Sequence, residues 1–399
     1  MRHPSRLISL LPLAAVLAAC NTEVGGEPVS YTSEIDTVAG VVHVTHSGDG
    51  VWATGTPWRA DTVRAVEIGA IDGADPYIFG SVTGVVVGEG GRIFVADGQA
   101  KEIRIFSPEG EFLDRFGRSG EGPGEFGNIS GLGRAPEGGV AVLDGAQARV
   151  SVFDAEGEFG RSFRIERPHM FIRSGSSVRF DNQGRYHDLT QLSRTPGVDS
   201  LGVVRYHPTG AVLDTVLMAV DDPEEVMIMQ NGRPSVSFAL AFAPHTSGAI
   251  GPDGRIYATL GAEYHIARLD PSGDTLRTVR RQVKAVPVSP AARDSAHERM
   301  VELYTTVTGV PPRDLPALPF EMPAIQALQL DESGHLWVLR GTADPSVMEW
   351  DLFDSEGGYF GAVSFPAMHV MHFGENTIAG VVRDELDVPR VRVIPIVRE

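Results

Sequence analysis

The feature of this sequence that most constrains its fold is an internal repeat of 47 residues. Residues 79–116 can be laid over residues 126–163 without a gap. The matched pairs include Phe79 with Phe126, Gly84 with Gly131, Ile93 with Val140, Asp97 with Asp144, and Gly110 with Gly157. A repeat of this length indicates supersecondary units that each bury an apolar face against the next unit.

Within each unit, polar and apolar residues alternate in short runs separated by glycine turns. In the first copy, strands are expected over 92–96, 102–106 and 112–116, with a further strand before the turn at Gly90-Gly91. Because successive side chains of a strand point to opposite faces, this alternation predicts half-buried strands. Four short antiparallel strands per 40–50 residues are typical of one β-propeller blade.

Diverged copies of the unit follow the two clear ones. Their first turns lie at 181–184, 251–254 and 331–334, which makes five blades. The last segment, 368–395, contains only three strand-like runs. Residues 62–68 precede the first blade at almost the same distance at which the fourth strand of blade one precedes blade two. We therefore expect them to supply the fourth strand of a sixth blade, so that both ends of the chain close the ring. Residues 41–45 also alternate; we expect them at the same junction, with their partner strand left open.

Three motifs resemble the NHL-repeat type of six-bladed propeller. They are the turn at 120–126 (GEGPGEF), the strand G-x-[IV]-x-V-x-D, and the element V-x-V-F-D-x-x-G-x-F. The resemblance covers roughly residues 62–397 and is strongest in the first two blades. It implies an all-β propeller of four-stranded antiparallel blades, which we place over 40–399. It does not specify a function, since such propellers include binding scaffolds, lyases, lactonases and sensors.

The first twenty residues predict export and lipidation. Arg2 and Arg6 precede the apolar run 7–19, which is too short to cross a bilayer comfortably. The sequence at 17–20 (LAAC) resembles the bacterial lipobox, which implies a signal peptide over 1–19 and a diacylglycerol-modified Cys20. We expect a flexible tether over 20–39. Asn21, where an Asp would favour the inner membrane, favours the outer membrane, on its periplasmic or surface side.

Composition excludes several classes of protein. Cys20 is the single cysteine, so no internal disulfide framework can form. The 34 Lys and Arg residues are outnumbered by 52 Asp and Glu, and the formal net charge is −18. Without a basic run that could follow phosphates, a nucleic-acid partner is not expected.

The predicted connections differ in length between the two faces of the ring. Turns joining first to second and third to fourth strands are uniformly tight, whereas long segments fall at 189–200, 217–238, 282–324 and 340–346. Within an insertion at about 283–323, between blades four and five, Ser289 and Pro290 are a strong start signal for a helix over 290–306. We expect binding surfaces on this long-connection face, although the helix would also be explained by ordinary packing.

Two aspartates repeat where the second strand of a blade ends. Asp97 and Asp144 could join a ring of carboxylates that holds Ca²⁺ through oxygen ligands. The later blades place Asp188, Leu260 and Arg340 at what we take as the same position, so such a ring would be incomplete. Capping of the following turn by each aspartate is the simpler explanation.

Four cationic or titratable side chains lie near the same connections. Lys101, Arg149, His187 and His265 could receive an acidic or sugar ligand near the axis, or could be solvated rim charges.

No catalytic residue and no cofactor is predicted, because H-E-x-x-H, G-x-S-x-G and S-x-x-K motifs are absent from the sequence. We therefore expect a lipid-anchored envelope module that binds a protein, peptide or glycan. The alternatives are a hydrolase or lyase that depends on Ca²⁺ or Zn²⁺ at the axis, and a mainly structural partner in an outer-membrane complex.

Overall fold

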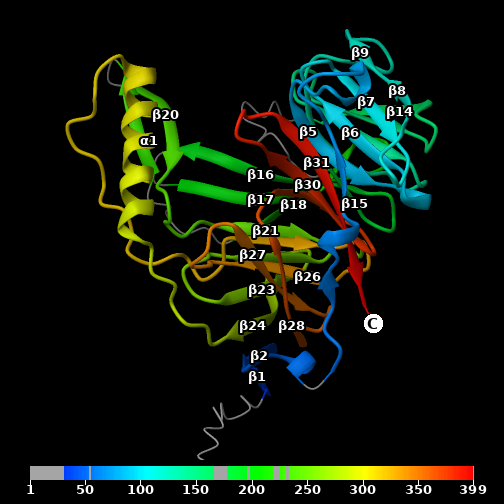
Figure 1. The fold of residues 1–399 in the computed structure, drawn as a ribbon. Coiled ribbons are helices and arrows are strands. Elements are labelled where there is room, and N and C mark those ends of the chain that lie inside the picture. Colours follow the sequence, from blue (N-terminus) through cyan, green and yellow to red (C-terminus); the bar gives the residue numbers. More distant parts are fainter. Residues whose placement is uncertain are drawn as a thin grey trace, which may run out of the picture.

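The computed structural model describes residues 31–53, 55–165, 178–195, 198–218, 225–230 and 233–398. They form a six-bladed β-propeller of antiparallel sheets with one α-helix among the described segments (Figure 1). The signal peptide, Cys20 and residues 20–30 of the expected tether lie outside these ranges. None of the described helices is long and apolar enough to cross a bilayer.

The two clear repeats form the first two blades, as predicted. Blade one has the order β5 (Val82–Val87), β6 (Ile93–Asp97), β7 (Glu102–Phe106) and β8 (Phe112–Phe116). Blade two repeats it with β11 (Ile129–Arg134), β12 (Val140–Asp144), β13 (Arg149–Phe153) and β14 (Phe159–Arg164). Between them, β9 (Arg118–Ser119) and β10 (Glu125–Phe126) form a short parallel pair.

The diverged copies keep this strand order. Blade three contains β15 (Arg179–Phe180), β16 (Tyr186–Thr195), β17 (Val198–Tyr206) and β18 (Val212–Leu217). Blade four contains β21 (Ser247–Ile250), β22 (Ile256–Thr259), β23 (His265–Leu269) and β24 (Thr275–Arg281). Blade five contains β25 (Ala327–Leu330), β26 (Leu336–Arg340), β27 (Val347–Phe353) and β28 (Tyr359–Pro366). The core lies between neighbouring blades; for example, Trp337 of blade five stacks on Phe373 of blade six, and Trp350 contacts the same ring edge-on.

The sixth blade is closed by both ends of the chain, which confirms the prediction. Its own strands are β29 (His369–Phe373), β30 (Thr377–Arg383) and β31 (Pro389–Val397). The fourth comes from the N-terminal side, where β4 (Val66–Ile68) and β3 (Arg59–Ala60) pair along β31. Residues 62–64, expected as strand, instead form a short 3-10 helix whose first N–H groups bond to Asp61.

The prediction for residues 41–45 is wrong in its location. Strand β2 (Val41–Ser47) pairs in parallel with β24 of blade four, and β1 (Thr32–Val38) adds outside it. Because β1 begins at Thr32, the tether expected over 20–39 can extend no further than residue 31. The alternation was the correct signal for a strand, but period-two patterning does not say which free sheet edge will accept it.

The N-terminal segment continues past blade five. Gly50 has φ of +85°, and a Cβ there would lie 2.5 Å from the Phe360 carbonyl oxygen, so only glycine fits this close approach. Trp52 stacks on Phe360 at 5.9 Å. Residues 31–53 and 55–68, which we call the belt, therefore contact the outer strands of blades four, five and six in succession.

The insertion between blades four and five contains α1 (Pro290–Thr308), close to the predicted helix. Ser289 Oγ accepts a hydrogen bond from the Ala292 N–H, and Gly309 ends the helix in the left-handed conformation. Figure 1 shows α1 beside the hairpin of β19 (Glu225–Gln230) and β20 (Arg233–Ala239), on the side reached by the tips of β16 and β17. A small core supports it, formed by Leu240, Ala243, Ala296, Met300 and Leu318.

Candidate functional site

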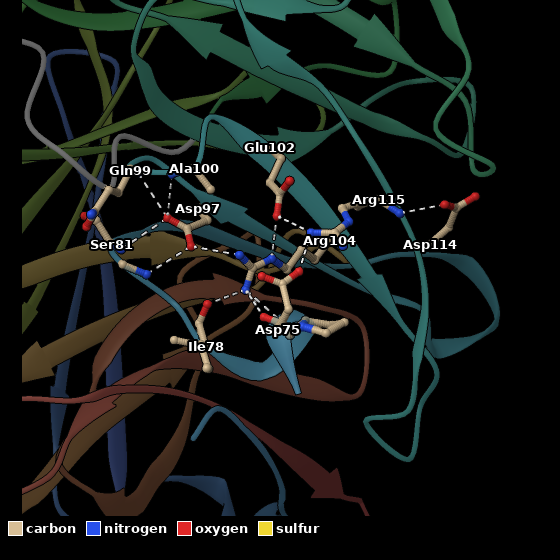
Figure 2. Close-up of polar contacts among 12 residues, drawn as sticks. Asp75, Ile78, Ser81, Asp97, Gln99, Ala100, Glu102, Arg104, Asp114 and Arg115 are labelled. Carbon is tan, nitrogen blue, oxygen red and sulfur yellow. Dashed lines mark hydrogen bonds and ion pairs between the residues drawn. The ribbon is translucent and has the colours of Figure 1, made fainter. Parts of the chain in front are cut away.

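The carboxylate of Asp97 caps the connection after β6. It accepts hydrogen bonds from the backbone N–H groups of Gly80, Ser81, Gln99 and Ala100 at 3.0–3.2 Å (Figure 2). The side chain is 1% exposed. Four N–H donors occupy the lone pairs that a metal ion would need, so the contacts support turn capping.

Arg104 on β7 completes this cap from the neighbouring strand. Its guanidinium lies 3.3 Å from Asp97, 2.8 Å from Glu102 and 2.6 Å from the Ile78 carbonyl oxygen (Figure 2). The Asp97–Arg104 pair is buried, so each charge depends on the other for compensation.

Asp144 has the same role in blade two. It accepts hydrogen bonds of 2.7–3.1 Å from the N–H groups of Gly127, Asn128, Ala146 and Gln147. In blade three the matching residue is Thr190 rather than Asp188. In blade two, the carbonyl oxygen of Gly139 accepts the hydrogen bond that closes the first turn, and Asp144 lies five residues after it. In blade three the corresponding carbonyl belongs to Arg185, and the residue five positions later is Thr190.

Lys101 and Arg149 hold the connection between blades one and two. Lys101 Nζ donates to the Gly127 carbonyl oxygen. Arg149 donates to the carbonyl oxygens of Glu121, Gly122 and Glu125 at 2.5–3.2 Å. These contacts fix the loop that contains the glycine-rich motif, and each cation already has protein partners.

The two histidines lie in different blades. His187 on β16 is buried, and its Nε2 is 3.0 Å from Asp181 Oδ2. Burial lowers the pKa of His187 despite that carboxylate. His265 begins β23 and is half-buried, and burial also lowers its pKa. The six predicted residues are thus spread over blades one to four and are not brought together in one site.

The structure instead brings together four side chains that the sequence did not single out. They are Arg134 at the end of β11, Arg179 on β15, Glu332 in the turn after β25, and His372 on β29. Glu332 Oε1 lies 3.5 Å from both Arg134 Nε and His372 Nε2. Arg179 donates to the Leu330 carbonyl oxygen and to Gln329 Oε1, both at 3.3 Å. Blades two and five are opposite in a six-membered ring, so these contacts cross its axis; we call the four residues the axial cluster.

Burial sets the protonation of this cluster. It raises the pKa of Glu332 against the opposing charges of Arg134 and Arg179. It also lowers the pKa of His372 to about 3, with the same two guanidinium groups acting in the same direction. His372 is therefore neutral near pH 7, and Glu332 is easier to protonate than an ordinary glutamate.

A register comparison could have found part of this cluster. One residue before the end of the first strand, blades three, five and six carry polar side chains where blades one, two and four do not. The residues at this position, in blade order, are Val86, Gly133, Arg179, Ala249, Gln329 and His372. Polar residues inside an apolar inner strand were the available signal.

The long-connection face exposes apolar side chains. Leu303 of α1 is 44% exposed, and Val310 and Phe320 of the return segment are 58% and 69% exposed. Arg293 lies over the Phe320 ring at 4.2 Å from its centroid. Exposed apolar groups gathered on an insertion are a common feature of interaction surfaces.

A cavity between two blades and the possible metal ligands give weaker evidence for a binding site. A cavity of about 200 Å³ between blades three and four is lined by Arg185, Arg205 and Arg255. Each of these arginines is paired with an aspartate at 2.5–3.0 Å. Over the described ranges, no three His, Cys, Asp or Glu residues gather in a way that could hold a metal ion.

Comparison with known proteins agrees with the fold. The DUF5128 family model, described as a 6-bladed beta-propeller, matches residues 73–172. A member of the duf4221 family from Bacteroides vulgatus is 10% identical, covering 85% of this chain and 98% of its own, with a TM-score of 0.50. No curated protein matches the chain.

Two further solved structures are similar at lower scores. A candidate exported protein from Bacteroides fragilis is 12% identical over 89% of this chain and 100% of its own, with a TM-score of 0.46. Virginiamycin B lyase from Staphylococcus aureus is 11% identical over 84% of this chain and 99% of its own, with a TM-score of 0.36. At such identities the likeness concerns the fold alone, since one propeller architecture serves many functions.

Proposed function

We propose that this protein is a lipid-anchored binding module of the bacterial cell envelope, which engages a protein or peptide through its long-connection face. The observation that carries this proposal is that β16–β17, β19–β20 and α1 all extend from one side of the ring. A rigid scaffold with long segments on one face is the usual arrangement of a binding protein.

Away from the axis, the opposite face consists of short turns joined by ion pairs. Glu356, in the turn between β27 and β28, lies 2.8–3.4 Å from guanidinium nitrogens of Arg255, Arg268 and Arg277 in blade four. His46 of β2 lies 2.7 Å from the neighbouring Gly357 carbonyl oxygen. These groups satisfy one another, which favours the other face for binding.

The chemistry of the long-connection face favours a polypeptide over a glycan. Exposed Leu303, Val310 and Phe320 offer apolar contact area of the kind that forms the centre of protein interfaces. Sugar sites rely more on polar groups around an aromatic ring.

The anchor and the propeller subtype belong to the same proposal. The LAAC sequence at 17–20 supports lipidation of Cys20, and Asn21 supports attachment to the outer membrane. The acidic net charge of −18 supports contact with the membrane through the lipid alone. Eleven residues separate Cys20 from Thr32 at the start of β1, enough to span at most about 40 Å when extended. The motifs of the first two blades support kinship with the NHL-repeat type.

The test places a photo-crosslinking residue at position 303 or position 276 of the full lipidated protein in its envelope. Both native leucines are 44% exposed, but Leu276 lies beside the tight turn of blade four. We expect a discrete cross-linked polypeptide from position 303 only. The Leu303→Asp/Phe320→Asp variant should lose it, and Leu213→Asp/Leu276→Asp should retain it. Cross-links of equal yield from both positions, or to glycan only, would contradict the proposal.

The alternative of a Ca²⁺- or Zn²⁺-dependent hydrolase or lyase at the axis is less well supported. Glu332 and His372 do converge there, but Arg134 and Arg179 place two positive charges beside them and would repel a divalent cation. Stoichiometric metal in elemental analysis of the purified protein would restore this alternative.

A further inference from the structure

We propose that the axial cluster is a binding site for a small carboxylate anion at the tight-turn end of the ring axis. This site is distinct from the long-connection face and does not depend on the function proposed for that face. Arg134 and Glu332 are about one quarter exposed (26% and 27%), whereas His372 is 6% exposed. A small molecule can therefore reach Arg134 and Glu332 from solvent, with the buried imidazole of His372 lying 3.5 Å from Glu332 Oε1.

The contacts within the cluster are too long for direct hydrogen bonds. Glu332 Oε1 lies 3.5 Å from Arg134 Nε and from His372 Nε2, and Arg134 Nη2 lies 3.8 Å from Glu89. Among the described residues, neither Glu332 Oε1 nor His372 Nε2 has a hydrogen-bond partner. Buried polar groups are almost always satisfied, so the missing partners point to a further molecule bound beside these groups, which lie too close together to hold one between them.

The charges around the cluster select an anion. Arg134 and Arg179 are cationic, and His372 is neutral at physiological pH. Asp331 is negative, but its oxygens accept hydrogen bonds from its own turn, from His335 and from Trp337. With Glu332 protonated, these groups leave one net positive charge. Glu89 beside Arg134 and Glu375 beside Glu332 are both exposed, so solvent screens their charges and they are left out of this count; the charge of Glu375 still raises the pKa of Glu332.

One net positive charge is balanced by a monoanion. Arg134 Nη1 donates to the Val87 carbonyl oxygen at 3.3 Å, which leaves Nε and Nη2 on one edge of the planar guanidinium to match the two oxygens of a carboxylate. A protonated Glu332 can donate a further hydrogen bond to that carboxylate. A phosphate, which carries more than one negative charge near pH 7, would leave an uncompensated charge in a partly buried site. The geometry therefore points to a small monocarboxylate.

The proposal makes binding depend on the protonation of Glu332. Ionised Glu332 would cancel the net charge and repel the ligand, so affinity should fall as pH rises through the elevated pKa of this carboxyl. Replacing Glu332 by Gln fixes the neutral form and should make affinity independent of pH.

The experiment measures thermal stabilisation and calorimetric binding of acetate by the full chain at constant ionic strength, from about pH 5 to about pH 8. Chloride and inorganic phosphate serve as comparison anions. We expect acetate to stabilise the wild type more at low pH and to stabilise Glu332→Gln equally across the range. Arg134→Gln should weaken acetate binding by about tenfold or more, the scale of one charge-assisted hydrogen bond. Glu137→Gln, at an exposed carboxylate in the matching turn of blade two, should behave as the wild type.

Three results would overturn the proposal. They are equal stabilisation by chloride, stronger binding of phosphate, and an unchanged affinity in Arg134→Gln. If Arg134→Gln proves unfolded by circular dichroism, the pH dependence of Glu332→Gln against the wild type still decides, because an unaltered slope contradicts the role given to Glu332. Loss of cross-linking at position 303 leaves this result unaffected, so the two proposals fail separately.

Discussion

The first two blades and the third blade use aspartate at opposite ends of the same strand. In blades one and two, Asp97 and Asp144 cap the connection that follows the second strand. In blade three, Asp181 instead caps the turn before that strand, accepting from the N–H groups of Gln183 and Arg185. Asp331 does the same in blade five.

In blade three, the loss of this cap accompanies a longer connection. A connection closed by four N–H bonds to one carboxylate is held short. With Thr190 in that place, the β16–β17 ladder continues from Gln191 opposite Leu201 to Thr195 opposite Val198. The divergence that removed the cap thus coincides with a long hairpin on the face we propose for binding.

A second divergence lies at the axis. The inner strands of blades one and two carry Val86 and Gly133 where blades three and six carry Arg179 and His372. The diverged blades therefore supply polar groups to the axis as well as long segments to one face. Of the two repeat-like blades, blade two contributes one member of the axial cluster, Arg134.

Removing the cap of blade one should cause the largest loss of stability. Asp97→Ala leaves four N–H groups without an acceptor and Arg104 without its buried partner, so we expect a loss of about 3–5 kcal/mol in the free energy of unfolding. Thr190→Ala at the matching position of blade three should cost about 1 kcal/mol. Urea denaturation of both variants measures this, and equal losses would show that the cap is not what distinguishes the blades.

The polar set at the axis should give stability a pH dependence. The pKa of His372 is about 3 in the folded protein, below its ordinary value of 6.5, so the unfolded chain binds the proton more readily. Stability should fall as pH decreases from about 6.5 towards 3, by up to about 1.4 kcal/mol per pH unit. Glu332, whose pKa is raised, has the opposite sign and loses stability as pH rises above its ordinary value.

The measurement is the free energy of unfolding of wild type and His372→Gln across this range. The variant should show a shallower decline on the acidic side. Curves that run parallel would mean that the imidazole is not held neutral by its surroundings.

Transplanting the short connection should have the smallest effect on stability. Residues 190–202 of blade three would be replaced by residues 97–102 of blade one, which carry their own capping aspartate. Because shortening a surface connection changes the closure entropy little, we expect the free energy of unfolding to change by no more than about 1 kcal/mol. Thermal unfolding of the transplant and the wild type measures this change. A collapse of the fold would show that the long hairpin is needed for the ring itself.

Much of the fold could be predicted because the repeat fixes it locally. The 47-residue register located the first two blades, the glycine turns located the next three, and Ser289-Pro290 located α1. The sequence did not show where the belt lies, because the alternating pattern of β2 is compatible with pairing at the free edge of any blade. Asp188 was taken for the residue that matches Asp97 because the register of a diverged blade is set by backbone hydrogen bonds that the sequence does not display.

The axial cluster was missed for a related reason. Arg134 and Glu332 are almost two hundred residues apart, and each is an ordinary charged residue near a turn. Only the closure of the ring brings opposite blades within reach of one another. The predicted six residues, by contrast, stood out because they repeat or are rare, and those that repeat do so for structural reasons.

The belt determines how a pull on the N-terminus would be felt. All seven residues of β1 are exposed, so peeling this strand from β2 uncovers little apolar surface. Beneath it, β2 buries Val44 and His46, and further along β4 locks the ring at Ile68. A force applied from the membrane would therefore separate β1 from β2 first. The pairing of β4 with β31, which closes the ring, would be disrupted only at higher force.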